Sequence, residues 1–305
     1  MTPVEGATAA GSLVGVPAPN FRLPAETQLG KVVLQIADLE RSLGYYTRVL
    51  GLELVARDAG TALLGAGGRA IVELQEKRGV APVPRRGLLG LYHFAILLPD
   101  RAALGRFLTH LGDLNERAGA SDHLVSEALY LQDPDGLGIE VYADRGRESW
   151  VYDASRQVAM ATQPLNVESV VAAALGEHWT GAPPGTTLGH VHLHVGDIDQ
   201  AAAFYHNALG FDKIVWSYPG ALFVSAGGYH HHLGLNTWAA GSRPAGEGDA
   251  RLLEWEIVLP TAADVDAALQ SLSSAGVAVT KDGGGLVARD PWGTQLRIIF
   301  AEQEN

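Results

Sequence analysis

Internal repetition constrains the fold of this chain more than any other feature of its sequence. The segment TQLGKVVLQIADLERSLGYYTRVLGL, which begins at Thr27, aligns with TTLGHVHLHVGDIDQAAAFYHNALGF, which begins at Thr186. The alignment pairs three residues at one constant offset: Asp38 with Asp197, Tyr46 with Tyr205 and Gly51 with Gly210. A match of this length indicates a duplicated structural unit.

A second pair of repeats follows the first. LYHFAILLPDRAALGRFLTHL, from Leu91, matches LLEWEIVLPTAADVDAALQSL, from Leu252, and the turns DPDG and DPWG come later in each. Each repeat reads as an alternating strand, a turn at Asp or Pro, a helix with apolar residues three and four apart, and short strands between turns. The chain is therefore predicted to contain four βαβββ modules.

The modules group into two predicted domains of an α+β fold. Modules one and two occupy residues 24–145, and modules three and four occupy residues 186–302. Residues 146–185 form a long, non-repeating segment rich in turn signals, and this segment is predicted to be the linker between the domains. Residues 1–23 are expected to form a loose N-terminal extension.

Composition narrows the functional classes. The chain has 305 residues, of which 47% are hydrophobic, enough for a large core and about two domains. A net charge of -12 disfavours a nucleic-acid partner, and no apolar run reaches the length of a membrane span. Because the chain has no cysteine, a metal site must use His, Asp or Glu, and a reducing cytoplasm is the expected location.

At this point the motifs carry a family resemblance. The pattern G(H/K)VxLxVxDLxxSxxFYxxxLGF, the DPDGxxIEVY strand and the four βαβββ units together resemble the vicinal oxygen chelate superfamily. The resemblance covers nearly the whole chain and implies cup-shaped mixed sheets with helices outside. It also implies that each module offers one metal ligand from its first strand and one from its last.

The repeat register locates these ligand positions. On the first strands, seven residues before the turn Asp or its equivalent, stand Lys31, His93, His190 and Glu254. On the last strands, four residues after the turn glycine, stand Val72, Glu140, His232 and Arg297. Two histidines and a carboxylate come together if module two faces module three, and the predicted metal ligands are then His93, Glu140 and His190.

This ligand set has a characteristic chemistry. Two neutral imidazoles and one carboxylate on one side of a divalent ion leave adjacent positions open, as in non-haem iron(II) oxygenases. The expected cofactor is therefore Fe(2+), with Mn(2+) as the alternative, and the expected substrates are a small aromatic molecule and O2. The resemblance then implies an extradiol dioxygenase of the catechol 2,3-dioxygenase type, acting in aromatic hydrocarbon catabolism.

More residues transfer from the resemblance to extradiol dioxygenases. Tyr130 and His123, upstream of Glu140, match their H…Y…DPxGxxxE segment and are expected to hold a substrate oxygen. In YHHHLGLNTW, His231 matches the acid/base histidine, which can accept and return a substrate proton near its ordinary pKa. The expected substrate pocket contains His192, His232, Asn236 and Trp238.

Several alternatives stay open from the sequence. If modules three and four faced each other, His190, His232 and Glu254 would form a rival ligand set. In our preferred pairing, modules one and four face each other, and Glu254 lies near Arg297 or Lys31. On a regular strand His231 and His232 point to opposite faces, so only a bulge lets both approach the metal. A glyoxalase-like isomerase, an epimerase and a non-catalytic binding protein are the alternative functions, and a homo-oligomer is compatible with the sequence.

Overall fold

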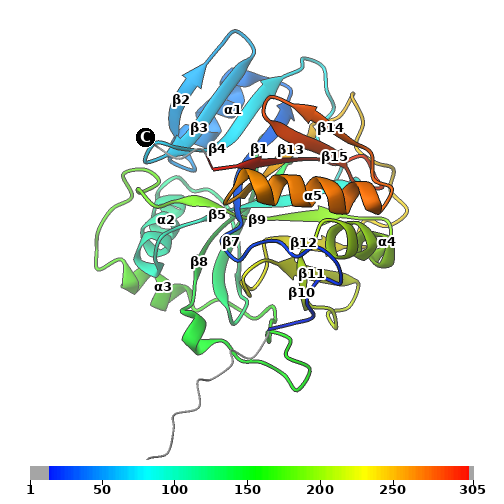
Figure 1. Ribbon diagram of the computed structural model, residues 1–305. Coiled ribbons are helices and arrows are strands. Elements are labelled where there is room, and N and C mark those ends of the chain that lie inside the picture. Colours follow the sequence, from blue (N-terminus) through cyan, green and yellow to red (C-terminus); the bar gives the residue numbers. More distant parts are fainter. Residues whose placement is uncertain (1–13, 302–305) are drawn as a thin grey trace, which may run out of the picture.

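The computed structural model describes residues 14–301, which form two large sheets with helices packed against them (Figure 1). Module one contains β1 (Gln28–Ile36), α1 (Leu39–Arg48), β2 (Glu53–Arg57), β3 (Thr61–Ala66) and β4 (Arg69–Glu76). Module two contains β5 (Gly90–Leu97), α2 (Arg101–Asp113), β6 (Gly119–Asp122), β7 (Ser126–Gln132) and β8 (Gly138–Asp144). The linker contains the short helices η1 (Arg147–Ser149) and α3 (Val167–Ala173).

The second half repeats the same order of elements. Module three contains β9 (Thr187–His194), α4 (Ile198–Ala202) with its π-helical continuation η2 (Ala203–Ala208), β10 (Asp212–Val215), β11 (Ala221–Ser225) and β12 (Leu233–Asn236). Module four contains β13 (Arg251–Leu259), α5 (Ala262–Ser274), β14 (Val279–Asp282), β15 (Gly285–Arg289) and β16 (Gln295–Phe300). The predicted α+β fold of four βαβββ modules is confirmed.

A polar cap fixes the register between the first strand and the helix of every module. The capping residues are Asp38, Asp100, Asp197 and Thr261, and each side chain accepts a hydrogen bond from the backbone N–H three residues later. Such a cap satisfies one of the unpaired N–H groups at a helix start. Because these are the turn residues that defined the sequence register, positions counted back from them are equivalent in all four modules.

Each sheet takes one module from each half of the chain. The first sheet has the order β10-β11-β12-β9-β5-β8-β7-β6, and the second has the order β14-β15-β16-β13-β1-β4-β3-β2. The two central pairs, β5 with β9 and β1 with β13, are antiparallel pairs of first strands. The predicted facing of module two with module three, and of module one with module four, is confirmed.

Alternation along β5 separates the polar side of the first sheet from the core. Phe94 is fully buried and its ring lies parallel to that of Tyr46 from α1, with centroids 6.5 Å apart. His93, the preceding residue, must point to the opposite face, because successive strand residues alternate. The Tyr46 hydroxyl also donates a hydrogen bond to Asp133 at 3.2 Å, as Tyr205 does to Asp290 at 3.0 Å. The repeated tyrosines thus tie each helix to the Asp-Pro turn of the next module.

The segment before module one is tied to module three. Of the predicted extension, residues 1–13 lie outside the described residues, while residues 14–23 are held by backbone and side-chain hydrogen bonds. Val16 bridges to Lys213, and Arg22 forms an ion pair with the buried carboxylate of Asp212. The expectation of a loose segment is therefore wrong for residues 14–23. Over the same described chain, no helix has both the length and the apolar character needed to cross a membrane.

Candidate metal centre

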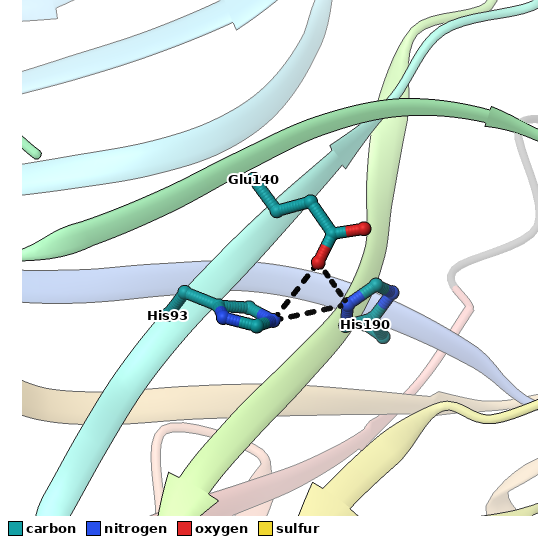
Figure 2. Close-up of side chains that lie close together, drawn as sticks. All are labelled: His93, Glu140 and His190. Atoms are coloured by element: carbon teal, nitrogen blue, oxygen red, sulfur yellow. Dashed lines mark hydrogen bonds and ion pairs between the residues drawn. The ribbon is translucent and has the colours of Figure 1, made fainter. Parts of the chain in front are cut away.

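Three side chains from three neighbouring strands converge in the first sheet (Figure 2). His93 on β5, Glu140 on β8 and His190 on β9 are all buried. The Nε2 atoms of His93 and His190 are 3.3 Å apart. Oε2 of Glu140 lies 3.0 Å from Nε2 of His93 and 3.2 Å from Nε2 of His190. The structure thus brings together the three residues that the sequence predicted as ligands, almost a hundred positions apart at their extremes.

The donor set and its spacing fit one divalent cation. Atoms about 2.1 Å from a common ion, at angles of about 90° to 109°, lie about 3.0–3.4 Å from one another. The three distances between the candidate ligand atoms fall in this range. Within residues 14–301 this is the group of His, Asp or Glu side chains whose ligand atoms all lie within 4.8 Å of one another. Nitrogen and oxygen donors of this kind suit iron and manganese.

The protonation states also favour a cation. Burial opposes the charge of Glu140, but the imidazoles of His190 and His93 outweigh burial and hold the pKa of Glu140 well below its ordinary value. Burial lowers the pKa of His93, against the opposing effect of Glu140. The ionised carboxylate of Glu140 and the unprotonated ring of His93, which these shifts favour, are the forms in which the two groups act as metal ligands.

A hydrogen-bonded pair borders the three candidate ligands. His123 lies between β6 and β7, and its Nε2 is 2.6 Å from the hydroxyl of Tyr130. Its Nδ1 is 2.8 Å from the carbonyl oxygen of Ala161, which can only accept, so Nδ1 carries the proton. In a neutral His123 ring Nε2 is then an acceptor, and the Tyr130 hydroxyl donates to it. Tyr130 faces Glu140 directly across β7 and β8, which places the pair beside the candidate metal centre.

Three consecutive histidines differ in orientation because their segment is not a strand. β11 ends at Ser225 and β12 begins at Leu233, with Gly227 and Gly228 at positive φ between them. The ring of His231 lies 4.1 Å from that of His190, centroid to centroid, and lines the cavity at the candidate metal centre.

His232 points away from the candidate metal centre, which corrects its assignment to the substrate pocket. Its Nδ1 lies 2.8 Å from Oγ of Ser225 and accepts from the backbone N–H of Ala226 at 3.2 Å. Burial lowers the pKa of His232 to about 3. Its ring lines a separate groove near Arg147 and Tyr229. The cause is the irregular backbone after Gly228, which removes the strand register assumed for this residue.

His192 and Trp238 line the cavity as expected, whereas Asn236 supports His192 from behind. Oδ1 of Asn236 accepts from the backbone N–H of Trp238, which fixes the orientation of the amide. Nδ2 of Asn236 therefore donates to Nε2 of His192 at 3.0 Å, while Oδ1 lies 2.7 Å from Nδ1 of His194. Asn236 is fully buried within this bridge, so its assignment to the pocket lining is wrong.

The cavity in front of the candidate ligands has a volume of about 230 Å³. Its walls include residues that the sequence reasoning missed, namely Tyr92, Met160, Ala161, Thr162, Tyr218 and Phe223. Met160 to Thr162 come from the linker, and their place over the cavity had no repeat register to indicate it. Tyr92 precedes His93, and an aromatic residue beside a predicted ligand is the signal that could have found it.

The equivalent positions of the second sheet hold an ion-pair network. Nε of Arg297 lies 2.7 Å from Oε1 of Glu254, and Lys31 pairs with Glu73 at 2.5 Å. The prediction that Glu254 lies near Arg297 is confirmed. The rival ligand set is wrong, because Glu254 stands in the second sheet while His190 stands in the first.

Comparison with known proteins agrees with this architecture. The family model described as the Glyoxalase/Bleomycin resistance protein/Dioxygenase superfamily matches residues 28–141 and 187–298. The chain is 43% identical over 270 residues to catechol-2,3-dioxygenase of Bacillus subtilis (strain 168), covering 87% of this chain and 94% of that protein.

Two solved structures show the same fold. A Bacillus subtilis protein described provisionally as a dioxygenase superposes with a TM-score of 0.62 at 16% identity, covering 92% of this chain and 86% of its own. Glyoxalase I from Zea mays superposes with a TM-score of 0.54 at 19% identity, covering 90% of this chain and 92% of its own. At these identities the two structures speak for the fold alone.

Proposed function

The chain belongs to the glyoxalase/bleomycin resistance protein/dioxygenase superfamily, and on that premise we propose that it is an extradiol ring-cleaving dioxygenase acting on catechol or a substituted catechol. The convergence of His93, Glu140 and His190 on one point carries the proposal. The 43% identical relative, named as a catechol-2,3-dioxygenase, supports the reaction type.

We propose that these three side chains hold iron(II), with manganese(II) as the alternative. When bound, such an ion stabilises ionised catechol oxygens by its charge, and iron(II) also supplies electrons to dioxygen. The buried strands β5, β8 and β9 fix the three ligands on one side only. The other side opens to the cavity, which is where a small aromatic substrate and O2 would enter.

Tyr130 and His123 are proposed to hold one substrate oxygen. The Tyr130 hydroxyl already donates to His123, so its oxygen lone pairs remain to accept a hydrogen bond from a catechol hydroxyl. Burial, aided by the charge of Glu140, raises the pKa of Tyr130 well above its ordinary value. The phenol therefore stays protonated, and it orients the substrate without ionising.

His231 is proposed as the acid/base residue. Its ring lies beside His190 on the cavity wall, and burial together with the neighbouring imidazoles holds its pKa well below the ordinary value. The ring is therefore neutral before the substrate arrives and has one nitrogen that can accept a catechol proton, while the expectation of an ordinary pKa for this residue is wrong. Proton transfer by a positioned side chain typically accelerates a reaction by about 10²–10⁴-fold.

A direct experiment tests the reaction. Protein reconstituted with iron(II) is mixed with catechol without air, and air is then admitted while absorbance and oxygen are recorded. We expect oxygen uptake and the yellow ring-fission product, and neither in the Glu140→Ala variant. Metal-replete protein that consumes no oxygen with catechol or its alkyl derivatives would reject the proposal and favour a glyoxalase-like isomerase.

The remaining assignments belong to the same proposal. The protein would act in aromatic hydrocarbon catabolism in the cytoplasm, and a homo-oligomer remains a proposal. Metal analysis of protein purified without chelator would distinguish iron from manganese.

A further inference from the structure

A chain of hydrogen bonds leads from the cavity wall to the end of β8. Nδ1 of His231 lies 2.9 Å from Nδ1 of His230, and Nε2 of His230 lies 2.8 Å from Oδ1 of Asp144. Asp144 is the last residue of β8, the strand that also carries Glu140. Strand β8 therefore supplies both the carboxylate of the candidate metal centre, Glu140, and the carboxylate at the far end of this series of hydrogen bonds, Asp144.

The order of donors and acceptors along the hydrogen bonds from Asp144 through His230 to His231 follows from the Asp144 carboxylate. The Asp144 carboxylate accepts, so Nε2 of His230 carries a proton and donates it. In a neutral His230 ring, Nδ1 is then an acceptor, so Nδ1 of His231 must carry the proton that joins the two rings. This leaves Nε2 of His231 without a proton. That atom has no hydrogen-bond partner in residues 14–301, and its ring lines the cavity.

The opposite arrangement is disfavoured by the same distances. With a proton on Nδ1 of a neutral His230, its Nε2 would present a lone pair to a carboxylate oxygen 2.8 Å away. Two acceptors at this distance repel each other. For a neutral His230 ring, the arrangement with Nε2 of His231 unprotonated is thus the one that satisfies both hydrogen bonds.

His230, the middle residue of this hydrogen-bond series, is held rigidly by packing. His230 is fully buried, and its ring packs against Tyr229 at 4.1 Å and edge-on to Trp150 at 5.4 Å, centroid to centroid. The Tyr229 hydroxyl donates to the same oxygen of Asp144 at 3.3 Å, outside the line that leads to His231. Packing therefore prevents the His230 ring from turning to exchange its two nitrogens.

We propose that Asp144 and His230 are positioning residues that fix the tautomer of His231, so that its unprotonated Nε2 faces the bound substrate. This inference rests on the proposed function, in which His231 accepts a catechol proton. Asp144 and His230 touch no substrate in this scheme, and they act only through His231.

The first test compares two variants of His230. In His230→Phe the ring volume remains but no acceptor faces His231, and we expect kcat to fall about 10²-fold, the typical value of a positioned base. KM for catechol and the bound iron should stay close to wild type. In His230→Asn the side-chain oxygen takes the place of Nδ1 and should restore most of kcat.

A spectroscopic signature separates a tautomer effect from a loosened structure. Without air, 4-nitrocatechol absorbs differently as a monoanion and as a dianion. Wild type and His230→Asn should show the dianion, and His230→Phe the monoanion. If His230→Phe binds iron, keeps the wild-type kcat and gives the dianion spectrum, the inference is overturned, and it is equally overturned if His230→Asn is as impaired as His230→Phe.

A second pair of variants avoids the core should His230→Phe fail to fold. Asp144→Asn can present either an oxygen or an NH2 to His230 and should lower kcat, while Tyr229→Phe removes the hydrogen bonds of its hydroxyl to Asp144 and Tyr142, leaves the bond between His230 and Asp144 in place, and should retain kcat. Equal kcat values for these two variants would overturn the inference. Failure of wild-type protein to cleave catechol would reject the proposed function, whereas an active wild type with unimpaired variants would reject only the role of Asp144 and His230.

Discussion

Replacing Asp133 by asparagine should change how the stability of this protein depends on pH. Burial raises the pKa of the Asp133 carboxyl to about 7 from its ordinary value of 3.8. Its Oδ1 accepts from the backbone N–H groups of Asp135 and Leu137 at 2.9 Å each, and Tyr46 donates to Oδ2. These hydrogen bonds lower the pKa but do not offset the cost of burying the charge.

The sign and size of the effect follow from this shift. Below pH 3.8 the carboxyl is protonated in both the folded and unfolded states, and the folded protein keeps its full stability. As pH rises toward 7, ionisation favours the unfolded state, and the loss totals about 4 kcal/mol at about 1.36 kcal/mol per unit. Above pH 7 the loss is complete and constant.

The assay is urea unfolding of metal-free wild type and Asp133→Asn, followed by tryptophan fluorescence between pH 5 and 8. An asparagine oxygen can still accept from both backbone N–H groups, and its NH2 can donate to the Tyr46 hydroxyl in place of accepting from it, so the pH-dependent part of the difference comes from the ionisation. We expect the free energy of unfolding of the variant, relative to wild type, to rise by about 2 kcal/mol between pH 5 and 7 and then to level off toward pH 8. A difference that is constant over this range would refute the reasoning.

Three further predictions concern the two sheets. Glu140→Ala should abolish retention of divalent metal during dialysis while Glu254→Ala keeps it, and metal analysis that finds equal retention would contradict the assignment. Gly234→Ala places a Cβ 2.8 Å from the ring of His192, so it should raise KM for catechol at unchanged metal content, and an unaltered KM would show that the ring is not needed. Arg297→Met should lower the free energy of unfolding by about 2–3 kcal/mol because it leaves the Glu254 carboxylate buried without its partner. Adding Glu254→Leu should recover most of this loss in urea unfolding, and two additive losses would argue against the ion pair.

The repeat made much of the candidate site predictable. Asp100 and Asp197 cap their helices, so counting seven residues back reached His93 and His190 on two adjacent strands. The ligand register of Glu140 followed in the same way from a turn glycine. The resemblance to the vicinal oxygen chelate superfamily indicated which strand positions carry ligands, and the repeat register then located those positions in this chain.

The two wrong pocket assignments have different physical causes. Asn236 does lie in β12, but its amide is fully buried and bridges the rings of His192 and His194. His232 was assigned by strand register, but the backbone leaves the strand after Ser225 and returns only at Leu233. Positive φ at Gly227 and Gly228 turns the segment between them. Side-chain direction in such a loop depends on tertiary contacts that no local pattern records.

The linker residues at the cavity could not be predicted from the sequence either. Met160 to Thr162 close the cavity and Ala161 anchors His123, yet nothing in their sequence indicates a position over another module. Tertiary hydrogen bonds of this kind leave no periodic trace in the sequence.

The interleaved sheets make the two halves of the chain interdependent. Residues 24–145 carry His93 and Glu140 but not His190, and each half alone would expose the edges of β1 and β5 or of β9 and β13. A chain severed within the linker should therefore yield two inactive fragments that regain metal affinity only when mixed, in a one-to-one complex. The covalent connection between the halves would then ensure that they are present in a one-to-one ratio. Two separately encoded halves would reach this ratio only if they were expressed in equal amounts.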